Sequence, residues 1–191
     1  ALCGFDRVSV IPFPELLPHP ENSSEQAVRG ALRAVRGKKS SMQFFQNLGA
    51  VTARGGADFN QALRRGAMEA RQAGVAVVLS DFLDPAGYET GVGALIGRGF
   101  QVNAVQILAP EELNPITYGD LRLVDSETGG LQEVTFGKFR LKAYQQTVQS
   151  YIQRLREFCQ PRGIHFFSVR SDASLETLLL TWGVSLMIQQ G

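Results

Sequence analysis

The stretch from Val75 to Asp84 reads Val-Ala-Val-Val-Leu-Ser-Asp-Phe-Leu-Asp. Its first five residues form an unbroken apolar run, which is typical of a central parallel strand buried on both faces. The run then changes abruptly to polar residues at Ser80 and Asp81. Open α/β sheets bind ligands outside the carboxyl ends of their strands. This stretch therefore predicts an α/β fold and the position of a candidate site.

The segments on either side of this strand alternate between helix and strand. A short helix is expected over residues 88–96 and a second strand over residues 101–108. Upstream, Asp58 stands where a helix N-cap is expected, with Gln61 three residues later in a capping-box arrangement. Such βαβ units predict a mainly parallel sheet.

The rest of the chain completes one α/β domain of 191 residues. Its further expected elements are a strand at 7–13, helices at 24–35, 41–50, 139–160 and 175–189, a hairpin from 121–124 and 131–136, and a strand at 164–169.

Composition describes an ordinary globular protein, with 44% hydrophobic residues, 19% charged residues and a net charge of +1. No run approaches the roughly 18 apolar residues of a membrane span, and a cytoplasmic location is expected. The two cysteines, Cys3 and Cys159, lack metal-site spacing and are expected to be free thiols. The start at Ala1, without a leader, suggests a piece of a longer protein.

Five motifs occur in an order that resembles domain-of-unknown-function family 58 (DUF58), whose fold is similar to the von Willebrand factor A domain. Their order and spacing hold from about Phe5 to the C-terminus. The motifs are Phe5-Asp6-Arg7-Val8, Gly55-Gly56-Ala57-Asp58-Phe59, Val77-Val78-Leu79-Ser80-Asp81-Phe82, Asp125-Ser126-Glu127-Thr128-Gly129-Gly130 and Ser171-Asp172-Ala173-Ser174-Leu175-Glu176. The resemblance implies a three-layer α/β/α sandwich, here lacking its first strand.

The resemblance also implies where a divalent cation would bind. In A domains, an Asp and two Ser of the first strand loop, a Thr of the second loop and an Asp of the third hold the ion. Here the first loop is missing, Ala57 replaces the threonine, and only Asp81 survives. One carboxylate is a poor substitute for the several oxygens that Mg²⁺ requires. We therefore expect an incomplete site, with Asp81 either a partial ligand or a cap for its own loop.

The expected function is a non-enzymatic protein-interaction module without a cofactor. The resemblance implies a partner of the MoxR-type AAA+ ATPase class. The expected contact face comprises the loops Gly55–Asp58, Ser80–Asp84 and Pro110–Asn114, with candidate binding residues Gly55, Gly56, Asp58, Ser80, Asp81, Asp84 and Glu111.

Charge is segregated between a basic stretch at residues 29–39 and an acidic one at residues 111–133, which suits a protein partner better than nucleic acid. Without its first strand, the sheet would also leave an unpaired edge that favours self-association. The alternative is a Mg²⁺-dependent hydrolase using Asp81, Asp84 and Asp172, or metal-mediated adhesion at Asp81. The hydrolase would require these three carboxylates to lie close enough together to bind one ion.

Overall fold

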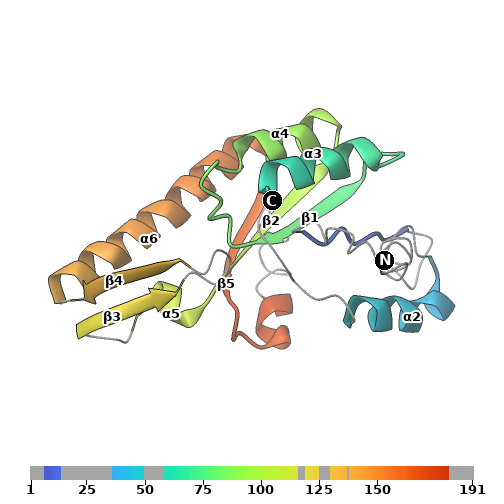
Figure 1. The fold of residues 1–191 in the computed structure, drawn as a ribbon. Coiled ribbons are helices and arrows are strands. Elements are labelled where there is room, and N and C mark those ends of the chain that lie inside the picture. The colour runs from blue at the N-terminus through green and yellow to red at the C-terminus, as the bar shows by residue number, and fades with distance from the viewer. Residues whose placement is uncertain are drawn as a thin grey trace.

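A parallel sheet lies at the centre of the computed structural model, which describes residues 7–13, 36–49, 58–115, 119–124, 130–136 and 138–180. Its strands are β1 (Val75–Ser80), β2 (Gln101–Leu108) and β5 (His165–Arg170), in the order β1-β2-β5 (Figure 1). Val78 lies opposite Ala104, which lies opposite Phe166. The predicted α/β class and parallel sheet are confirmed.

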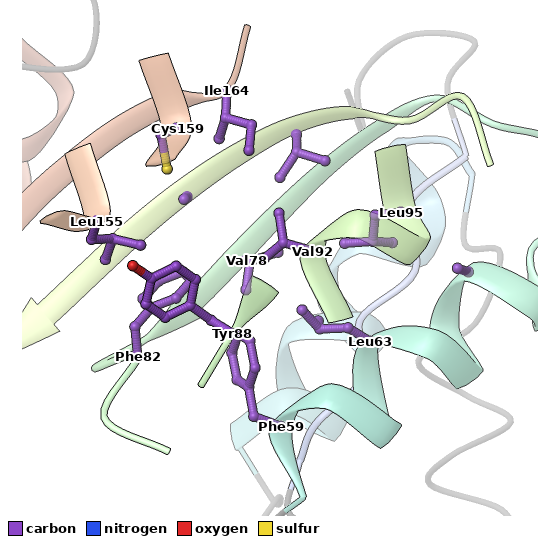
Figure 2. Close-up of a cluster of buried hydrophobic side chains, with 13 residues drawn as sticks. Phe59, Leu63, Val78, Phe82, Tyr88, Val92, Leu95, Leu155, Cys159 and Ile164 are labelled. Atoms are coloured by element: carbon purple, nitrogen blue, oxygen red, sulfur yellow. The ribbon is translucent and has the colours of Figure 1, made fainter. Parts of the chain in front are cut away.

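Three helices pack against one face of this sheet: α3 (Phe59–Glu69), α4 (Glu89–Gly97) and α6 (Lys138–Cys159). Each contributes side chains to a single apolar cluster, which is drawn in Figure 2. Its members are Phe59, Leu63, Ala67, Val78, Phe82, Tyr88, Val92, Leu95, Val102, Ala104, Leu155, Cys159 and Ile164. Removal of this apolar surface from water is the main force that holds the helices on the sheet.

The other face of β1 is exposed, because side chains alternate along a strand. Val75, Val77 and Leu79 are 64%, 43% and 57% exposed, whereas Val78 is 4% exposed. In the part of the chain that the structure describes, β1 is also an edge strand, paired with β2 alone. The prediction that β1 is central and buried on both faces is therefore wrong for these residues.

Helices α3 and α4 approach each other closely at Gly91. A Cβ atom there would lie 2.9 Å from the Cα of Asn60 and 3.2 Å from the Cβ of Leu63. Real Cβ atoms essentially never show the shorter of these distances, so glycine is required for this packing. The contact holds the start of α4 against the start of α3.

The hairpin lies apart from the main sheet, with β3 (Gly119–Val124) antiparallel to β4 (Leu131–Phe136), as predicted (Figure 1). Helix α2 (Lys38–Gly49) also matches its prediction, and residues 175–180 begin the expected last helix. The short α5 (Pro110–Leu113) and the 3₁₀ turn Gln160–Arg162 were not predicted.

The strand predicted at residues 7–13 is wrong, because this segment has only an isolated bridge at Val8. Pro12 lacks the backbone N–H that a ladder needs. The segment instead lies beside α3, where Ile11 is near Gly66 and the Phe13 ring lies 5.7 Å from that of Phe59. The predicted helix at 24–35 falls outside the described residues. Among those described, no helix combines the length and apolarity needed to cross a membrane.

Candidate functional site

The loop between β1 and α4, residues 81–88, occupies the carboxyl edge of the sheet. Its second residue, Phe82, has a backbone φ of 60° and is 1% exposed. Left-handed backbone is unfavourable for a bulky residue, so burial of the ring must offset that strain. The ring lies between those of Phe59 and Tyr88, at centroid distances of 5.3 and 6.0 Å (Figure 2).

Side chains from other elements hold the backbone of this loop. Gln106 of β2 donates from Nε2 to the carbonyl oxygen of Asp81 at 3.0 Å. Tyr151 of α6 donates its hydroxyl proton to the carbonyl oxygen of Phe82. Buried carbonyl groups need such partners, since an unpaired one is costly. The loop is thus fixed by residues 25 and 69 positions away in the chain.

Asp84 joins the loop to the first turn of α3. Its Oδ2 accepts from the backbone N–H of Phe59 at 3.0 Å, and its Oδ1 accepts from that of Ala86 at 2.7 Å. Asp58 accepts from the N–H of Gln61 at 2.8 Å, which confirms its predicted role as N-cap. Both carboxylates therefore satisfy amides that a helix end or turn leaves unpaired.

Asn60 connects the same loop to α4 and was not identified from the sequence. Its Nδ2 donates to the carbonyl of Gly87 at 2.8 Å. Its Oδ1 accepts from Thr90 Oγ1 and from the N–H of Gly91, at 2.8 and 2.7 Å. Its only signal in the sequence is spacing: Asn60 lies three and seven residues before Leu63 and Ala67, so the three share one face of the helix. An asparagine buried on such a face usually has hydrogen-bond partners for its side-chain amide.

Ser80 and Asp81 form local turns at the end of β1. The N–H of Phe82 donates to Ser80 Oγ, and the N–H of Leu83 donates to Asp81 Oδ1, both at 3.0 Å. These contacts are the local capping expected of such residues. The interpretation of Asp81 as a partial metal ligand stays a prediction.

The carboxylates of the metal-dependent alternative do not converge. No group of three or more histidine, cysteine, aspartate or glutamate side chains placed to hold a metal ion occurs within the described ranges. Asp172 instead pairs with Arg170, at 2.6 Å between Oδ2 and Nη2, and this hydrogen bond lowers the pKa of Asp172. Glu111 lies exposed in α5. Gly55, Gly56 and Ala57 fall outside the described residues.

An open pocket of about 570 Å³ lies between the loop and α6. Loop residues Leu83 and Tyr88 line one side, and Tyr151, Arg154 and Phe158 of α6 line the other. The Tyr88 ring meets those of Tyr151 and Phe158 edge to face, at 6.4 and 5.2 Å. The sequence analysis predicted the helix that carries Tyr151 and Arg154 but identified neither residue as part of a site.

Burial governs the ionisation of the groups behind this pocket. It raises the pKa of Tyr151 to about 12, with smaller contributions from Tyr88 and Glu89. Burial likewise raises the pKa of Tyr88, and nearby Glu89 adds to that effect. Both phenols are therefore neutral near pH 7. Burial raises the pKa of Cys159 to about 11, so this free thiol is chemically quiet.

These features define an α/β domain with a parallel sheet and a fixed loop at its carboxyl edge. The sequence profile of a family described as "Protein of unknown function DUF58" matches residues 4–153, and the chain belongs to that family. It is also similar to "Uncharacterized protein MAV169" of Mycobacterium avium, with 39% identity over 74 residues. The match spans 39% of this chain and 41% of that protein. No solved structure matches the chain.

Proposed function

We propose that this domain is a non-enzymatic protein-interaction module whose contact face is the carboxyl edge of the sheet. The observation that carries the proposal is the fixed loop 81–88, which presents Leu83 with 45% of its surface exposed. Leu83 stands beside the open pocket. A loop already held in one conformation loses little entropy on binding, and that favours recognition of a partner.

The roles of the acidic residues support this interpretation over hydrolysis. Asp58 and Asp84 accept hydrogen bonds from backbone amides at the start of α3. Asp81 accepts one within its own loop. A general base or metal ligand needs a carboxylate oxygen directed at substrate or ion. The contacts of these side chains instead serve the shape of the surface.

The proposed partner is an AAA+ ATPase of the MoxR type, in the cytoplasm, with the loops Gly55–Asp58 and Pro110–Asn114 adding to the contact face. We propose in addition that the fold is that of a von Willebrand factor A domain, with a second helical layer over the exposed face of the sheet. Exposed Val77 and Leu79 on that face support such a layer. Among the described residues β1 pairs with β2 alone, and such a free strand edge supports a tendency to self-associate.

Leu83→Ser tests the proposal without a change of charge. Binding to a MoxR-type ATPase of the same organism, measured by biolayer interferometry, is expected to weaken by about tenfold. Met68→Ser is the matched control. Met68 is 78% exposed near the last residue of α3, a helix whose first turn contacts the loop, and its loss should leave binding unchanged. Equal affinities for Leu83→Ser and the unaltered protein would refute the contact face.

A further inference from the structure

The outer side of α2 carries exposed apolar side chains. Met42, Phe45 and Leu48 are 68%, 57% and 37% exposed, and they follow one another at the three-residue spacing of one helix face. Phe44 is only 4% exposed, so it marks the side of α2 that faces the rest of the protein. With about 3.6 residues per turn, Met42 and Phe44 lie nearly on opposite sides of the helix. We call Met42, Phe45 and Leu48 the apolar stripe.

Little in the described part of the chain covers this stripe. Helix α2 lies away from α3, α4 and α6 (Figure 1), and no described helix or strand makes more than slight contact with it. The Phe45 ring meets the Phe44 ring edge to face, with the centroids 5.8 Å apart. Apolar side chains that lie together at a surface indicate a binding site more strongly than isolated ones do.

The sequence around α2 is basic throughout. Every charged residue between Glu25 and Asp58 is an arginine or a lysine. These residues are Arg29, Arg33, Arg36, Lys38, Lys39 and Arg54. Because the net charge of the whole chain is only +1, the remainder of the chain is acidic and the positive charge is concentrated in this segment. Such a segment suits a partner whose surface is uniformly negative.

Positive charge and the apolar stripe meet on α2 itself. Lys38 and Lys39 are the first two residues of the helix, and no acidic residue occurs in it. Lys38 precedes Met42 by four residues and Phe45 by seven, which places it on the same helix face, at the end of the stripe. Cations beside an apolar face are typical of a helix that lies in the interface of a membrane.

Going beyond the proposed function and independently of it, we propose that α2 docks the domain onto an anionic phospholipid surface. The apolar stripe enters the boundary between the headgroups and the acyl chains, and Lys38 and Lys39 meet the negative groups of the headgroups. Charge complementarity carries the choice, because an anionic leaflet attracts clustered lysines and arginines and this segment has no acid to be repelled. A stripe of three side chains on a short helix predicts weak, reversible binding.

A groove in a partner protein is a poorer match for the same surface. The cores of protein interfaces are depleted in lysine, whereas a layer of anionic headgroups attracts it. A lipid surface also presents its negative charge outside and its apolar groups beneath. The apolar stripe with lysines at one end matches that order, since a lysine can reach the headgroups while its neighbours are buried more deeply.

Vesicle sedimentation with the chain of 191 residues tests the proposal. The vesicles consist of phosphatidylcholine alone or of equal parts of phosphatidylcholine and phosphatidylserine. Binding should be saturable, at least about tenfold tighter to the vesicles with phosphatidylserine, and weaker as the salt concentration rises. Phe45→Ser and Lys38→Glu should each weaken it by about tenfold. Because a glutamate suits the first turn of a helix, Lys38→Glu should leave α2 folded.

Met68→Ser and Lys142→Glu are the matched controls. Both residues are exposed, on α3 and α6, so these variants repeat the same kinds of change away from α2. They should leave the affinity nearly unaltered, and circular dichroism verifies that every variant is folded. The proposal is overturned if the protein binds neither kind of vesicle, or both equally well.

Two further results would also overturn the proposal. One is an equal loss of vesicle binding in the α2 variants and their controls. The other is normal vesicle binding by Phe45→Ser and Lys38→Glu together with a loss of binding to the proposed ATPase, because that result would assign the apolar stripe to a protein contact.

Discussion

Replacing Asp84 by alanine should destabilise the domain more than replacing Asp58, although both acids stand at the start of α3. Asp84→Ala removes two charge-assisted hydrogen bonds, to the N–H groups of Phe59 and Ala86. Each such bond contributes about 1.5–3 kcal/mol. Phe59 is only 3% exposed, so water replaces the carboxylate poorly there. With partial relaxation of the loop, we expect a loss of about 2–4 kcal/mol in the free energy of unfolding.

Asp58→Ala removes one exposed capping bond and should cost about 1 kcal/mol. Asp84→Asn keeps one acceptor and should lie between the two alanine variants. Urea unfolding followed by circular dichroism measures all three. With a slope of about 2 kcal/mol per molar, Asp84→Ala should lower the midpoint by about 1–2 M. A loss for Asp84→Ala no larger than that for Asp58→Ala would refute this structural role and return Asp84 to the candidates for ligand binding.

Gly91→Ala should destabilise the domain by about 1–3 kcal/mol, because its Cβ would lie 2.9 Å from the Cα of Asn60. Gly93→Ala should instead stabilise it by up to about 1 kcal/mol, because a Cβ there would have no tertiary neighbour within 4 Å. Thermal melts that shifted in the same direction for both variants would contradict the α3–α4 packing. Phe82→Gly should be about 1 kcal/mol more stable than Phe82→Ala, because the backbone φ of 60° suits glycine; the reverse order in urea unfolding would count against that conformation. Burial raises the pKa of Tyr151 to about 12, above the value of about 10 in an unfolded chain. The neutral phenol therefore contributes fully to the free energy of unfolding below a pH of about 10, and this contribution is lost as the pH rises to about 12. Tyr151→Phe should therefore lose stability less steeply over that interval in a pH series of urea midpoints, and parallel slopes would show that the phenol is not responsible.

Local pattern was sufficient to predict most helices and strands. The apolar run from Val75 to Leu79 predicted the position of β1 correctly, because its short length, its valines and the preceding Gly74 favour a strand over a helix. Its predicted burial on both faces was wrong, since one face of β1 is exposed. The Asp58–Gln61 spacing located the start of α3, since capping depends on residues three apart. The strand expected at residues 7–13 was wrong, because β-branched composition cannot show whether a segment finds a pairing partner.

The contacts that shape the candidate site could not be predicted in the same way. Asp84 was predicted as a binding residue, yet one of its oxygens accepts from an amide 25 positions away. Gln106 and Tyr151 support the loop from β2 and α6, and no spacing in the sequence links them to it. Such long-range contacts depend on how the helices pack on the sheet. Only the position of the site at the carboxyl edge follows from the sequence.

The anchoring of loop 81–88 to α3, β2 and α6 makes it mechanically continuous with the body of the domain. A partner that displaced the loop would have to disrupt the first turn of α3, the end of β2 and the side of α6 together. A partner that fits the loop as it stands would meet no such resistance and could dock as a rigid body. Conversely, a pull applied through the loop would pass directly into the sheet. If the proposed partner binds this loop, its force would therefore reach the sheet without a prior change in the shape of the loop.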